Sequence, residues 1–100
     1  MILGQVSKQP GELFPLTVDY TPELATGETV SSAVVTSRNA ATGADSSATI
    51  LSGAVTVASP KVTQKVTAGT SGDRHIITML ATTSTGNKYE GEIELHIREE

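Results

Sequence analysis

Two histidines are the candidate bases in this chain of 100 residues. His75 follows Asp73 and Arg74 at the start of an alternating segment, where a side chain near a loop could act as a general base. Serines are plentiful as candidate nucleophiles, but the sequence contains no G-x-S-x-G elbow. Nucleophilic catalysis also needs a third group that orients the base. Because no such constellation is readable, the sequence favours His75 as a strand residue packed at the edge of the core.

His96 and Glu94 are the candidate metal ligands. They stand two residues apart, so in a strand they share a face at a separation of about 7 Å. Metal sites usually add ligands from other elements, and none can be identified in this sequence, which contains no cysteine. The row Glu90, Glu92 and Glu94 is therefore interpreted as a solvated acidic strand face. We predict no metal and no cofactor.

The glycine-rich segment Ala68–Gly72 could suggest a phosphate loop. That motif needs a lysine and a following helix, whereas an alternating segment follows here, so the glycines are interpreted as turn residues. Three aromatic residues are too few for a sugar-stacking platform. The sequence thus predicts that the protein is not an enzyme, and a small hydrolase or metalloprotein is the weakest class of function.

Charge and hydropathy restrict the partners. The formal net charge is −4, and the basic residues are scattered singly, whereas nucleic-acid binding requires a basic stripe. No apolar run reaches the roughly 20 residues that span a bilayer. The first residues lack the basic and apolar regions of a secretory signal. We therefore expect no nucleic-acid partner, no membrane partner and synthesis in the cytoplasm.

Alternation of apolar and polar residues defines the fold class. Tyr89, Ile93, Leu95 and Ile97 share one face of a closing segment, and a Gly-Asn pair joins it to the preceding strand from Asp73 as a hairpin. Further strands are predicted at 14–20, 30–37, 48–51, 54–58 and 62–67, with a bulge in the second of these. About seven strands with regular turn signals indicate an all-β antiparallel sandwich or a small barrel.

A simple two-sheet sandwich does not account for the burial of two apolar regions. Residues 1–11 are predicted to form an N-terminal arm ahead of a single domain at 12–100, and the apolar residues of the arm indicate that something ties it down. The strand from Asp73 also carries aliphatic residues on both faces. We hypothesise that its second face is covered by the arm or by a partner chain. The candidate partner-binding residues are Ile2, Leu3, Val6, Ile76 and Leu80.

Several segments together resemble a known family. They are Lys8–Glu12, Leu16–Tyr20, Gly27–Val30, Ala68–Gly72, Ile77-Thr78 and the closing hairpin to Arg98. This pattern resembles the small immunoglobulin-like structural proteins of tailed phages, which include fibre–tail adaptors and accessory virion proteins. The resemblance implies an immunoglobulin-like antiparallel β-sandwich.

The same resemblance implies a function and a location. It points to a non-enzymatic structural protein of the virion, made in the host cytoplasm. Such a protein would decorate the capsid or connect head, tail and fibre through protein–protein contacts. Its partners would be capsid, connector or fibre proteins and copies of itself. The alternative is an extracellular immunoglobulin-like adhesin or binding module of a bacterium.

Overall fold

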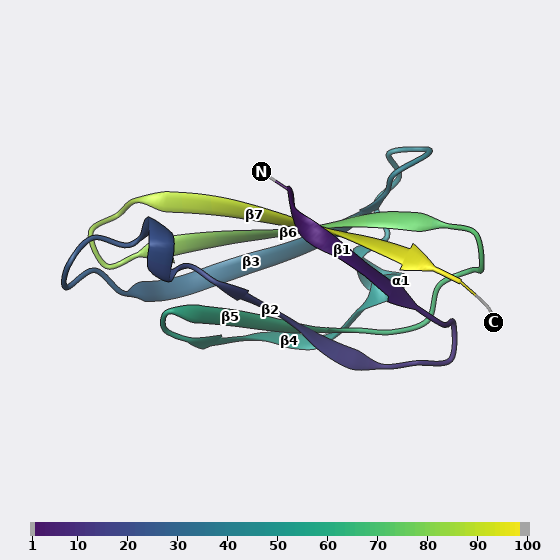
Figure 1. The fold of residues 1–100 in the computed structure, drawn as a ribbon, viewed down its shortest axis with the longest axis horizontal. Coiled ribbons are helices and arrows are strands. Elements are labelled where there is room, and N and C mark those ends of the chain that lie inside the picture. Colours follow the sequence, from purple (N-terminus) through teal and green to yellow (C-terminus); the bar gives the residue numbers. More distant parts are fainter. Residues whose placement is uncertain (1, 99–100) are drawn as a thin grey trace.

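Seven strands in the described residues form two sheets that pack face to face (Figure 1). The computed structural model describes residues 2–98, and the side chains of residues 4–98. One sheet has the order β1-β7-β6-β3 and the other the order β2-β5-β4. The strands are β1 (Ile2–Lys8), β2 (Phe14–Asp19), β3 (Val30–Asn39), β4 (Leu51–Ala58), β5 (Lys61–Val66), β6 (Arg74–Thr83) and β7 (Lys88–Ile97). The predicted all-β sandwich is confirmed, and the barrel alternative is wrong.

The strands are distributed between the sheets as in an immunoglobulin domain, apart from the first strand. Strands two, five and four form one sheet, and strands three, six and seven lie together in the other. The first strand pairs with the last, and the two run parallel. The expectation of a purely antiparallel sandwich is therefore wrong at this pair. Residues 9–13 carry the chain across to β2 in the other sheet, so β1 forms no antiparallel hairpin with β2 and pairs with β7 instead.

Strand β1 corresponds to the segment expected to be an arm. It pairs with β7 from Ile2 beside Glu92 to Lys8 beside Ile97. The backbone of this segment is thus tied down by a ladder of hydrogen bonds rather than by side-chain packing alone. The side chain of Val6 packs against the core.

The core lies between β6 and β7 of one sheet and the facing strands of the other. The inward residues of these two strands are almost completely buried, as their alternation predicts. They are Ile77, Met79, Ala81, Ile93, Leu95 and Ile97. Tyr89, which was expected to complete this face, is half-buried because it lies near the end of the strand.

Strand β2 is an edge strand, and its Pro15 explains why: proline has no N–H to donate to a second neighbour. The strand leads into a single helical turn, a 3₁₀ turn at Thr21–Glu23. Tyr20, between the two, is buried, and its hydroxyl donates to the carbonyl of Met79 at 2.5 Å. This bond joins the two sheets.

Residues 47–58 differ from the sequence prediction. A short helical turn, α1 (Ser47–Ile50), replaces the strand expected at 48–51. The carboxylate of Asp45 accepts the Ser47 N–H at 2.8 Å, which starts the turn, and Ile50 is fully buried. The gap between the strands expected at 48–51 and 54–58 is instead an irregularity inside β4, where the register with β5 shifts and Gly53 has a φ of 72°.

Glu28 ties two turns together at the other end of the molecule. Its side chain accepts hydrogen bonds from the Ala25 N–H at 2.9 Å and the Thr83 hydroxyl at 2.7 Å. The Thr85 hydroxyl and the Asn87 amide also donate to it. These bonds, with that from Thr85 contributing most, lower the pKa of Glu28 from 4.5 to about 2. The 25–28 turn is thereby fixed to the β6–β7 hairpin.

Acid should weaken this connection. Because the pKa of Glu28 is lower in the folded than in the unfolded chain, its contribution to stability is complete above the ordinary value of 4.5 and disappears as pH falls toward 2. We expect thermal melts of the parent protein to lose more stability between about pH 5 and pH 2 than those of Glu28→Gln. The exposed Glu23→Gln variant should keep the parent's slope. Parallel slopes for the parent and Glu28→Gln would contradict this assignment.

Candidate functional site

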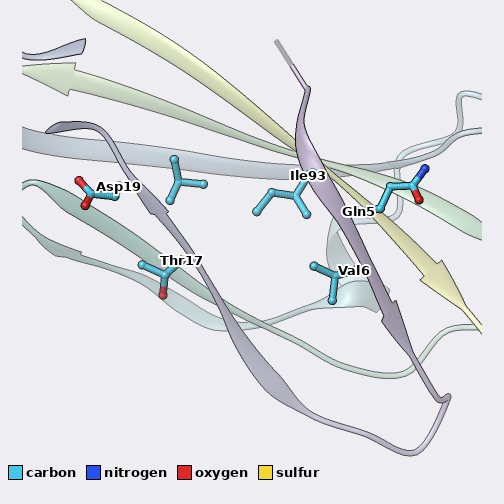
Figure 2. A pocket seen from close by; sticks show the side chains of 7 residues that line it. Gln5, Val6, Thr17, Asp19 and Ile93 are labelled. Carbon is cyan, nitrogen blue, oxygen red and sulfur yellow. The ribbon is translucent and has the colours of Figure 1, made fainter. Parts of the chain in front are cut away.

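A groove of about 460 Å³ lies where the two sheets separate between β1 and β2 (Figure 2). Its lining residues come from β1, β2 and β7 and are Gly4, Gln5, Val6, Thr17, Val18, Asp19 and Ile93. In Figure 2 the side chain of Gln5 points away from Ile93, whereas Val6 lies on the side of β2. The groove exists because β1 and β2 are edge strands of different sheets and no ladder joins them.

A second hollow, of about 140 Å³, continues the groove along β2. It shares Val18 and Asp19 with the first and extends to Tyr20, Tyr89 and Gly91. Aliphatic and aromatic side chains therefore follow the open side of the sandwich for much of its length. Such a lining suits apolar contacts with another chain.

Asp19 supplies the carboxylate that lines both hollows, and this carboxylate is hydrogen-bonded within the protein. It accepts hydrogen bonds from the Thr21 hydroxyl at 2.6 Å and the Thr21 N–H at 2.9 Å. The hydrogen bond from the hydroxyl, followed by that from the N–H, lowers the pKa of Asp19. The carboxylate is thus an ionised group that orders the 3₁₀ turn.

The candidate partner-binding residues fall into two separate regions. Val6 lines the groove, whereas Ile76 and Leu80 lie half-buried on the outer face of β6. The side chains of Ile2 and Leu3 lie outside the described residues. Strand β1 lies beside β7 in the plane of the sheet, and β7 separates it from β6. In the part of the chain that the structure describes, the arm thus does not cover Ile76 and Leu80, and a partner chain stays the prediction.

The outer face of the β1-β7-β6-β3 sheet combines apolar and charged rows. Leu80 lies beside Val34 of β3, which is 62% exposed, and Ile76 lies beside Arg38. The sequence missed Val34 because the alternation of apolar and polar residues in its strand is irregular after Val30, at the bulge between Val30 and Ser32. Val34 and Leu80 together form an apolar patch at the β3 side of this face.

Two of the three glutamates in the acidic row of β7 are paired with basic side chains. Glu92 lies 3.4 Å from Arg38, and Glu94 lies 2.9 Å from Arg74. His96 is 3.0 Å from Glu94, as their spacing predicts. Among the described residues no group of three side chains is placed to hold a metal ion. Since β7 lies between two other strands, its charges protect no sheet edge. They hold neighbouring strands in register.

His75 is buried at the end of the core, where the sequence places it. Its Nδ1 lies 2.9 Å from the Ser46 hydroxyl, which is 2.7 Å from the Ser37 hydroxyl. Burial lowers the pKa of His75, an effect partly opposed by Asp73, so the neutral imidazole is favoured. Nε2 has no hydrogen-bond partner among the described residues, so no third group orients the ring as a catalytic base requires. Sequence reasoning missed Ser46 because only the folding of the 40–46 loop brings it to His75.

No helix in the described part of the chain is long and apolar enough to cross a membrane. A β-sandwich with an apolar groove and an apolar patch on one sheet face has the surfaces of a binding module. The model of one protein family, described as podophage GP4 fiber-tail adaptor protein gp77, matches residues 8–96. The chain belongs to this family, and the resemblance inferred from the sequence is confirmed. It is accordingly a phage structural protein of the fibre–tail adaptor type and a part of the virion.

The family match begins at the last residue of β1 and includes β2–β6 and nearly all of β7. It thus covers both faces of the sandwich and the turn at Ala68–Gly72. No curated protein and no solved structure matches the chain.

Proposed function

We propose that the protein is a non-enzymatic connector between the phage tail and its fibres. The observation that carries this proposal is the fibre–tail adaptor family match over residues 8–96. Capsid decoration is the weaker of the two virion roles, because the family description concerns the tail. No feature of the surface formed by the described residues favours the bacterial adhesin alternative. The protein would be made in the host cytoplasm and built into the particle there.

The connector would bind virion proteins through two surfaces. One is the outer face of β6, where Ile76 and Leu80 interrupt a polar surface. The other is the open side of the sandwich, where Val6 and its neighbours line the groove and where Ile2 and Leu3 would add apolar contacts. Burial of aliphatic side chains supplies the affinity of such contacts, and the charged row beside them sets the orientation.

A double substitution tests the first surface. Ile76→Asp with Leu80→Asp should lower binding of the purified protein to particles that lack it by at least about tenfold, because two carboxylates would be desolvated in the contact. Co-sedimentation with such particles measures the bound fraction. Because both residues are only half-buried, thermal melts should show that the variant still folds.

Thr56→Asp with Ala58→Asp is the matched control, since it adds the same two charges to exposed positions of β4 on the other sheet, away from the groove. This control should bind as the parent does. Undiminished binding of the Ile76/Leu80 variant would exclude the outer face of β6 as a docking site. If the parent protein neither binds nor occurs in purified particles, the connector role itself is wrong.

A further inference from the structure

Strand β3 is an edge of its sheet that the protein closes only at its two ends. At the C-terminal end of β3 the Ser37 N–H donates to the Ser47 hydroxyl at 2.9 Å, and the Asn39 N–H donates to the carbonyl of Ala44 at 2.8 Å. At the N-terminal end of β3 the Val30 N–H donates to the Ser59 hydroxyl at 3.0 Å. Loops thus occupy the backbone groups that point away from β6 at both ends of β3.

In the middle of the same edge no strand of the described chain is paired to β3. Ser37 and Asn39 make their outward bonds on the side away from β6, so Val34 and Thr36 are the residues that bond to β6, and Ala33 and Val35 point outward. Within the described residues no hydrogen bond is made by the outward groups of Ala33 and Val35. No charged residue and no proline lies between Val30 and Ser37, although such residues normally protect an exposed edge.

We propose that β3 is a self-association edge, at which a second copy of this chain adds its own β3 antiparallel. A two-fold axis at Val34 places Ala33 of one copy opposite Val35 of the other, and the reverse. Each of these pairs exchanges two backbone hydrogen bonds, so all the outward groups of Ala33 and Val35 are satisfied. A second copy of β3 is therefore the partner that satisfies all of these backbone groups by symmetry.

The side chains agree with this pairing. Val34 would face its own symmetry mate as a non-hydrogen-bonded pair, the type in which side chains approach most closely. This contact would cover Val34, which is 62% exposed on the outer sheet face. On the inner face Ala33 and Val35, both partly buried against the core, would cover one another. A charged peptide would find no complementary charge along this stretch.

Both edges of the other sheet are less suited to self-pairing. Strand β2 carries Pro15, and β4 is interrupted by the irregularity between Ser52 and Thr56. A contact centred on Ala33, Val34 and Val35 of each copy is small, so the free protein should dimerise weakly. Several copies held in one virion would have a high local concentration, which makes such a weak contact effective. The proposal does not depend on the tail role, because it concerns the isolated protein.

Amide exchange combined with sedimentation tests the proposal. From about 10 μM to about 1 mM, sedimentation velocity should show monomer converting to dimer. Over this range the amides of Ala33 and Val35 should gain protection, whereas those of Val34 and Thr36 should be protected throughout. A monomer at the highest concentration, with unprotected Ala33 and Val35 amides, would overturn the proposal.

Two variants define the contact. Val34→Lys would place two ammonium groups opposite one another and should weaken the dimer by at least about tenfold. Ser7→Lys adds the same charge to an exposed position of β1 and should leave dimerisation unchanged. Ala33→Pro removes only an outward N–H and should also weaken the dimer, which provides a second test if Val34→Lys folds poorly. Association that persists unchanged in both β3 variants would place the contact elsewhere.

Discussion

Replacing Lys8 by methionine is expected to lower the free energy of unfolding by about 2–4 kcal/mol. Lys8 ends β1 and is only 1% exposed, yet its Nζ reaches three backbone carbonyls. It donates to Ala68 and Gln9 at 2.7 Å and to Pro10 at 3.2 Å. Burial lowers the pKa of Lys8, an effect partly opposed by Glu12. Methionine would fill much of the same space and leave the three acceptors without their shared donor.

Urea denaturation measures this loss. Lys65→Met on the exposed side of β5 is the matched control and should change stability by less than about 0.5 kcal/mol. Amide exchange of β1 should also accelerate in the Lys8 variant, because the ammonium joins the end of β1 to the turn that begins at Ala68. If both lysine variants unfold at the same urea concentration, the bonds of Lys8 contribute nothing to stability.

Gly69→Ala is expected to cost about 2–4 kcal/mol, through two separate effects. The residue has a φ of 100°, which is unfavourable for any side chain. A Cβ at this position would also lie 2.9 Å from Cδ1 and Cγ1 of Ile97 and 3.4 Å from Cδ1 of Ile50. Since Ile50 and Ile97 are buried, the crowding would be transmitted to the core.

Gly72→Ala separates the two effects. Gly72 has a similar φ of 95°, but a Cβ there would meet no atom within 4 Å. This variant should therefore lose only the conformational part, about 1–2 kcal/mol. The difference between the two variants, measured by thermal or urea unfolding, is the cost of crowding Ile97. Equal losses would mean that the Ile97 side chain moves aside freely.

The features that sequence predicts best are those that depend on local pattern. Alternation placed the β6–β7 hairpin and its buried face. The irregular alternation after Val30 predicted the bulge that the register of β3 shows. The helical turn α1 was missed because four residues are too short for a helical period, and its start depends on the Asp45 side chain.

Features that depend on distant segments could not be predicted in this way. The pairing of β1 with β7 joins residues at opposite ends of the chain, and no spacing encodes it. The four donors to Glu28 come from two turns that are separated by more than 50 residues. The groove beside Val6 exists only because β1 and β2 belong to different sheets. The function was inferred from family resemblance, since no single residue carries it.

The parallel pairing of β1 and β7 also determines how the domain resists force. Ile2 lies beside Glu92 and Lys8 beside Ile97, so the outer ends of the two strands lie at opposite ends of their shared ladder. Tension applied at the two chain termini therefore acts along the ladder and loads its hydrogen bonds together in shear. A hairpin pulled at its open end would instead lose its bonds one after another. The hydrogen bonds between the first and last strands are thus expected to resist tension together and to break together.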